Sequence, residues 1–129
     1  MKKLALTALA LGLIATFTLA GALQAQPRYI YQDLDTLGGS ESLAYDINNA
    51  GHVVGWASNG DGYERAFLKN PGQPMMDLDD LGGSASQAFG INTGGWVVGG
   101  SENGDGDWHA FLKEPDQPMV DLGTLGGDL

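Results

Sequence analysis

The chain contains a repeat with a period of 44 residues. The segment Asp-Leu-Asp-Asp-Leu-Gly-Gly-Ser at 77–84 has a counterpart, Asp-Leu-Asp-Thr-Leu-Gly-Gly-Ser, at 33–40, and a third copy begins within residues 121–129. Residues 33–76 align with residues 77–120 without a gap, and about 27 of the 44 positions are identical. A gapless repeat of this length indicates that one supersecondary unit is built twice, with loops of matched length.

Each repeat alternates short apolar segments with turn-forming residues, and neither shows a sustained helical period. The pairs Asn-Gly and Asp-Gly in 59–62, and the Asn and Gly of 48–51, predict hairpin turns because both residue types tolerate a positive φ. The pair Gly38-Gly39 is expected to end the first strand. Strands are expected at residues 28–36, 43–48, 52–57 and 64–69, and then at 75–79, 87–92, 96–101, 107–113 and 119–122.

Four short strands in a 44-residue unit are typical of one β-propeller blade. We therefore expect an all-β fold of two four-stranded antiparallel propeller-type blades that form an incomplete ring. A small β-sandwich and a β-solenoid remain alternatives. Two blades leave apolar faces and strand edges open, and three arrangements would cover them. Several chains could assemble, for example three into a ring; the sequence could be a truncated part of a longer repeat protein; or the two blades could pack face to face.

The first 25 residues have the pattern of a secretory signal peptide. Lys2 and Lys3 precede an uncharged apolar run over residues 4–22, and small residues follow, with cleavage expected after Ala22 or Ala25. The alternative is a membrane anchor, because about 19 apolar residues can just span a bilayer. We expect a signal peptide, a secreted or periplasmic protein, and no membrane association after cleavage.

The composition of the chain bears on its partners and on how it can be stabilised. Without Lys2 and Lys3, four of the six basic residues face 16 acidic ones, which gives a net charge of about −12. Nucleic acid is therefore not expected as a partner, because phosphate binding requires clustered Lys and Arg. The chain has no cysteine, so an exported domain must be stabilised by packing, by a metal ion or by association rather than by disulfides.

Three motifs together resemble the HAF repeat, a family of bacterial extracellular repeat proteins named for a His-Ala-Phe signature. They are Asp-Leu-Gly-Thr-Leu-Gly-Gly at 121–127, Ile-Asn-x-x-Gly-x-Val-Val-Gly at 47–55 and 91–99, and His-Ala-Phe-Leu at 109–112. The first repeat departs from the signature, with Arg65 in place of the histidine. The resemblance covers nearly all of residues 26–129 and implies a secreted propeller-type scaffold, with no catalytic residues to transfer.

The Asn-Gly-Asp-Gly loops are candidate calcium sites. Asn103, Asp105 and Asp107 occupy alternate positions, as oxygen ligands do in calcium loops, while Asn59 and Asp61 give the first repeat a smaller set. No Glu stands at the twelfth position of such a loop. The alternative is that these residues only form hairpin turns. No other cofactor is expected.

Four aromatic side chains are candidate ligand-binding residues, because aromatic rings stack on sugars: Trp56, Trp96, Trp108 and Tyr63. Tyr45 belongs to the same group, and the alternative role for all five is to fill space between sheets. A partner could then be a glycan, an extracellular protein or a second copy of the chain.

Asp77, Asp79 and Asp80 could be read as paired carboxylates of a glycosidase. The third repeat keeps only Asp121, so a structural hydrogen-bonding role is the favoured interpretation. The two histidines, His52 and His109, occupy different repeat positions, and the chain lacks the thiols and further imidazoles that a zinc site or a triad would need.

The sequence therefore predicts a structural or interaction scaffold rather than an enzyme. The alternative is a lectin-like propeller assembled from several chains.

Overall fold

A computed structural model describes residues 28–126 of the chain. The predicted signal peptide at 1–25 lies outside the described residues. Internal contacts divide the chain into two units, residues 1–31 and residues 32–129. In the first unit, residues 28–31 have no regular secondary structure; the second unit holds every strand described below.

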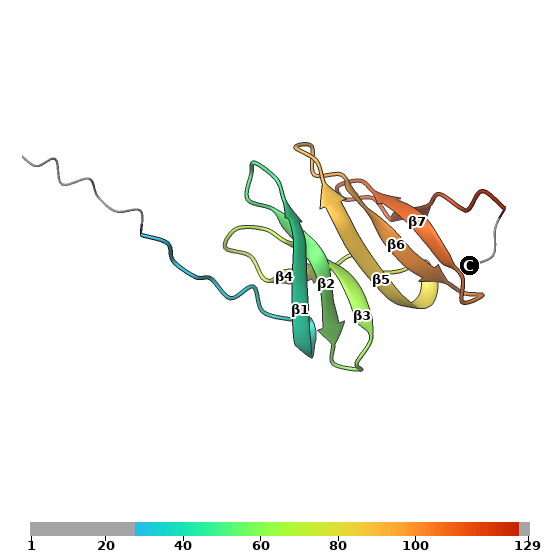
Figure 1. The fold of residues 1–129 in the computed structure, drawn as a ribbon, viewed down its shortest axis with the longest axis horizontal. Helices are drawn as coiled ribbons and strands as arrows, with labels where there is room; N and C mark the ends of the chain where they lie inside the picture. Colours follow the sequence, from blue (N-terminus) through green and yellow to red (C-terminus); the bar gives the residue numbers. More distant parts are fainter. Residues whose placement is uncertain (1–27, 127–129) are drawn as a thin grey trace, which may run out of the picture. The chain divides into compact units, whose positions relative to one another are not determined.

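Two four-stranded antiparallel sheets make up the second unit, and the described residues contain no helix (Figure 1). Sheet 1 has the order β1-β2-β3-β4 and sheet 2 the order β5-β6-β7-β8, so each strand pairs with its neighbour in sequence. The two sheets do not close into a ring, which confirms the expected all-β, two-sheet fold. The strands are β1 (Gly38–Ile47), β2 (Val53–Asn59), β3 (Glu64–Lys69), β4 (Met75–Asp77), β5 (Gly82–Ile91), β6 (Val97–Asn103), β7 (Trp108–Lys113) and β8 (Met119–Asp121).

The expectation for the first strand was wrong. Residues 28–36 form no strand, and Gly38 begins β1 instead of marking its end. The fourth strand of sheet 1 is β4, which the sequence pattern had assigned to the start of the second repeat; it pairs with β3 through Phe67 and Asp77. By the repeat, residues 31–33 correspond to β4. Among residues 28–126, no strand precedes β1 with which this segment could pair.

The hairpin turns are confirmed at the predicted positions. The amide of Gly51 donates to the carbonyl of Asn48 at 3.0 Å, and Gly51 has a φ of +80°. Gly62 donates to the carbonyl of Asn59 at 3.0 Å in the same way. Asn and Gly thus close the first two hairpins of sheet 1, and the repeat places equivalent turns in sheet 2.

A β-bulge explains the second glycine of the Gly-x-Val-Val-Gly motif. The register of β5 on β6 shifts between Ala88 and Gly90, and the bulge brings the carbonyl of Gln87 close to Gly99. A Cβ atom on Gly99 would lie 2.0 Å from that carbonyl oxygen and 2.7 Å from the Phe111 ring. Only glycine fits at this position, and Gly55 meets the carbonyl of Leu43 in the equivalent way.

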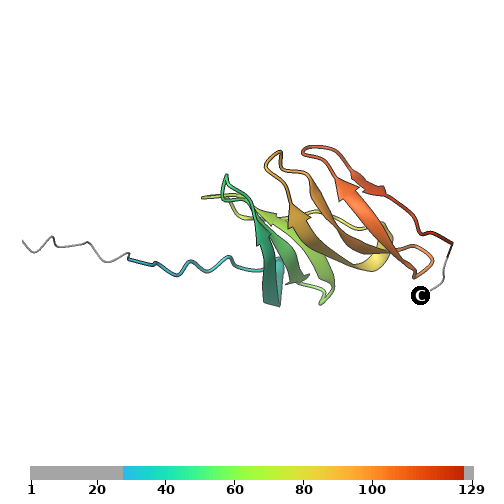
Figure 2. The same ribbon diagram turned by 45° about the horizontal axis from the view of Figure 1, so that its top comes forward.

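The core lies between the two sheets. Strand β5 contacts β1, β2 and β3, and it runs beside sheet 1 in both views (Figures 1 and 2). The buried apolar cluster joins residues of both sheets and of the connector between them: Val54, Ala66, Leu78, Ala88, Val97 and Phe111. Each sheet thus has one face in this contact and one face outside it.

We expect Gly99→Ala to lower the free energy of unfolding by at least about 2 kcal/mol, because the new methyl group overlaps a backbone carbonyl that cannot move away freely. Urea denaturation followed by circular dichroism measures this loss. Gly104→Ala is the control, since its Cβ would have 3.8 Å to the nearest carbonyl oxygen and its φ is not positive. Equal effects of the two variants would contradict the bulge explanation.

Candidate functional site

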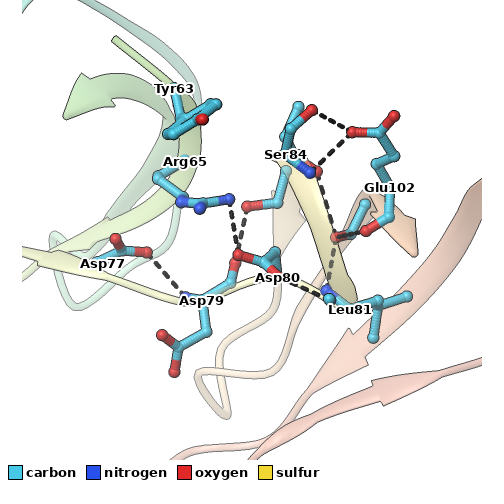
Figure 3. A network of polar contacts seen from close by, with 12 residues as sticks. Tyr63, Arg65, Asp77, Asp79, Asp80, Leu81, Ser84 and Glu102 are labelled. Atoms are coloured by element: carbon cyan, nitrogen blue, oxygen red, sulfur yellow. Dashed lines mark hydrogen bonds and ion pairs between the residues drawn. The ribbon is translucent and has the colours of Figure 1, made fainter. Parts of the chain in front are cut away.

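The recurring aspartate of the repeat forms a local turn. The Asp77 carboxylate accepts the amide N–H of Asp79 at 2.8 Å (Figure 3), and Asp33 and Asp121 accept from the amides two residues further on at 2.9 and 2.6 Å. Asp79 has a φ of +68°, a conformation that this hydrogen bond helps to hold. The predicted hydrogen-bonding role of these aspartates is thus confirmed.

The connector between the sheets is held by an ion pair. Arg65 on β3 lies 2.7 Å from the Asp80 carboxylate, and its guanidinium lies 5.5 Å from the centre of the Tyr63 ring (Figure 3). In the second repeat, His109 occupies the position of Arg65 and lies 2.8 Å from Asp121. At this repeat position, Arg65 contacts a carboxylate of the connector, whereas His109 contacts the last residue of β8.

Two of the recurring aspartates differ in acidity. Burial raises the pKa of Asp77 above its ordinary value of 3.8, and this effect exceeds the lowering by the Asp79 amide and by Arg65. The pKa of Asp121 is lowered, first by the amide hydrogen bond from Gly123 and then by the hydrogen bond with His109. Both carboxylates are engaged by backbone amides, Asp77 by that of Asp79 and Asp121 by that of Gly123.

The Asn-Gly-Asp-Gly loops direct their asparagine oxygens to the backbone. The Asn103 side-chain oxygen accepts the amides of Asp105 and Asp107, both at 2.9 Å. Asn59 accepts the amides of Asp61 and Tyr63 at 3.0 and 2.9 Å. Within residues 28–126, no three His, Asp or Glu side chains gather where they could hold a metal ion. The loop geometry supports the hairpin-turn interpretation, and the Asn103→Ala experiment below tests the calcium alternative.

The predicted aromatic residues lie on separate elements. Trp56 is on β2, Tyr63 in the β2–β3 loop, Trp96 before β6 and Trp108 on β7. The Trp56 indole N–H donates to the Tyr45 hydroxyl at 3.0 Å. Tyr45 and Phe89, on different sheets, form a ring pair whose centres are 5.8 Å apart. Sequence reasoning missed Phe89, although an aromatic residue recurs at this repeat position.

An open hollow of about 520 Å³ lies beside Trp56. Its lining combines one aromatic ring with two carboxylates, from Glu41 and Glu64, and with the hydroxyls of Ser40 and Ser58. Glu64 also accepts a hydrogen bond from the Gln87 side chain of the other sheet at 2.7 Å. An aromatic surface edged by acceptors and hydroxyls has the chemistry to bind a neutral polyol or sugar.

The outer face of sheet 2 is apolar and exposed; we define it by Val98, Trp108, Ala110 and Leu122. Val98 is 47% exposed, whereas Val54, the same repeat position in sheet 1, is fully buried. Leu122 is 57% exposed and its equivalent Leu78 is 2% exposed. Sheet 2 therefore presents to solvent the surface that sheet 1 buries against β5.

The outer face of sheet 1 is partly exposed; we define it by Ser42, Ala44, Ile47 and Val53. Ile47 is 62% exposed and Ala44 is also exposed. Their equivalents in sheet 2, Ser86, Ala88, Ile91 and Val97, lie in the contact between the sheets or at its border. The described part of the chain thus has one open face of each kind.

Comparison with models of known protein families, with curated proteins and with solved structures found no match. Residues 28–126 contain no helix that is long and apolar enough to cross a bilayer.

We expect Asp77→Asn to stabilise the protein at pH 7. Because the folded-state pKa of Asp77 is raised, ionisation of this carboxyl costs stability at pH values above it, and an amide oxygen can still accept the Asp79 N–H. The gain should shrink as the pH falls toward 3.8, where Asp77 is protonated. Denaturation of the variant and of the unmodified protein at pH 7 and pH 3.5 measures the difference in their free energies of unfolding at each pH.

Asp121→Asn is the matched control for this prediction. It should destabilise the protein at pH 7, because the pKa of Asp121 is lowered in the folded state and its charged form is therefore favoured there. A stability change of the same sign in both variants would show that burial does not govern Asp77.

We expect Asn103→Ala to cost about 1 kcal/mol of stability, because two loop amides lose their acceptor. The loss should be the same with and without calcium, and calcium should not change the melting temperature of the unmodified protein. Asn103→Asp keeps the acceptor and is the control. A calcium-dependent rise in melting temperature that Asn103→Ala abolishes would establish the calcium site instead.

Proposed function

We propose that this protein is an extracytoplasmic repeat scaffold whose sheets bind partners through their open faces, without catalysing a reaction. The observation that carries the proposal is the contrast between equivalent positions: Val54 and Leu78 are buried, while Val98 and Leu122 are exposed. A contiguous exposed apolar surface of this kind is typical of protein interaction sites. The signal-peptide pattern and the resemblance to the HAF repeat support the compartment.

The arrangement of the carboxylates is compatible with this role. Asp77 and Asp121 are occupied by backbone amides, and Asp80 is paired with Arg65. These side chains shape the connectors between strands and sheets, and a scaffold needs such rigid connectors to keep its faces in register.

A glycan-binding function is the second candidate, and the hollow beside Trp56 favours it. Trp56 provides a ring on which a sugar can stack, and Glu41 and Ser58 provide polar atoms around it. This function is compatible with the first, because the hollow and the outer face of sheet 2 involve different residues.

We expect the mature protein to associate in solution and to show no turnover of model glycosides. Light scattering across a range of concentrations and a glycosidase assay measure the two properties. Val98→Asp should reduce association, because it places a charge on the exposed apolar face.

A glycan array tests the second candidate, with Trp56→Ala expected to lose any binding that Trp96→Ala keeps. Turnover that Asp77→Asn abolishes would contradict the scaffold proposal, as would a monomer that binds neither protein nor glycan.

A further inference from the structure

The contact between the two sheets of one chain supplies a template for a contact between chains. In this internal contact the Ser86 hydroxyl accepts the amide N–H of Ala66 at 2.9 Å and donates to the carbonyl of Asp79 at 2.7 Å. The Asn48 side-chain amide donates to the carbonyl of Asn92 at 3.0 Å. These polar contacts fix the register of one sheet on the other, and the buried apolar cluster lies between them.

In this internal contact, sheet 1 supplies the donor, which is the Ala66 amide. The outer face of sheet 2 carries the equivalent of this donor. Ala110 is the equivalent of Ala66, and its carbonyl accepts the Leu122 amide at 2.9 Å just as the Ala66 carbonyl accepts that of Leu78. Within residues 28–126 the structure gives the Ala110 amide no counterpart of the Ser86 hydroxyl. Asn92 corresponds to Asn48, and it is exposed where Asn48 is buried.

In the internal contact, sheet 2 supplies the acceptor, which is the Ser86 hydroxyl. The outer face of sheet 1 carries the equivalent of this acceptor. Ser42 is the equivalent of Ser86, and its hydroxyl donates to the Asp35 carbonyl at 2.8 Å, as Ser86 donates to Asp79. In the described part of the chain no amide donates to the Ser42 hydroxyl, so its acceptor position is open. The Ala110 amide and the Ser42 hydroxyl are therefore a donor and an acceptor placed for the same bond on two different faces.

One pair of positions that differs between the repeats differs in a matched way. Internally, Gln87 donates to Glu64 at 2.7 Å, which is a contact between two polar side chains. The equivalent positions in the other repeat hold Leu43 and Trp108, which are 46% and 36% exposed. A polar pair has thus been replaced by an apolar pair, so each substitution suits the other when the two open faces meet.

From these observations we infer that the outer face of sheet 2 binds the outer face of sheet 1 of a second copy of this chain, head to tail, with the Ala110 amide donating to the partner's Ser42. The inference rests on the proposed scaffold function and specifies its partner. Such a contact joins two different surfaces, and it gives a closed ring or an open filament depending on the rotation between sheets. Because propellers hold about four to eight blades and each chain has two sheets, a ring would need two to four chains.

Two single-face variants and their mixture test this inference. Ala110→Arg blocks the outer face of sheet 2, and Ala44→Arg blocks the outer face of sheet 1; both side chains are exposed, so each variant should fold. Each variant alone should be a monomer by light scattering. An equimolar mixture should form a two-chain complex, because each variant keeps the face that the other has lost. Gln73→Arg, in the exposed β3–β4 turn, adds the same side chain elsewhere and should associate like the unmodified protein.

The possible outcomes separate this inference from the broader proposal. If Ala44→Arg alone still forms dimers while Ala110→Arg does not, two copies join through the same face and the head-to-tail inference is wrong, although the scaffold proposal stands. If the unmodified protein associates but the mixture gives no two-chain complex, the inference is also wrong. A monomeric unmodified protein that binds a glycan or another protein overturns the inference alone.

Discussion

The packing of β5 against sheet 1 is the contact on which the rest of the structure depends. Each sheet has only four short strands, and a sheet of this size cannot shield both of its faces. In the described chain, β5 covers one face of sheet 1 and thereby buries one face of its own sheet. Hydrogen bonds from Ser86 and Asn48 set the relative position of the sheets, and apolar side chains fill the space.

The residues that recur in the repeat maintain the geometry of the chain. Gly99 permits a close backbone approach at a bulge, Asp77 holds a turn between the sheets, and Asn103 caps a hairpin. Each of these roles is local. The residues that differ between repeats, such as Glu64 and Trp108, give the two sheets different surfaces.

Much of the fold could be predicted from the sequence, because Asn and Gly at fixed spacing determine hairpins locally. Residues 28–36 form no strand although their pattern favours one, and among the described residues no strand pairs with this segment, which a local pattern does not report. The candidate site was harder to predict. The Tyr45–Phe89 contact and the Gln87–Glu64 hydrogen bond join residues of different sheets, and no local pattern reports such contacts.

Asp46 strengthens the junction inside the chain, because its carboxylate accepts the amide N–H of Ile91 at 2.8 Å. The equivalent residue in the second repeat is Gly90, which offers no carboxylate to a neighbouring chain. In the proposed assembly, junctions between chains therefore lack a charge-assisted bond that junctions within chains possess. Protomers would dissociate and exchange before either half of a chain separates from the other, so the assembly could be remodelled without refolding.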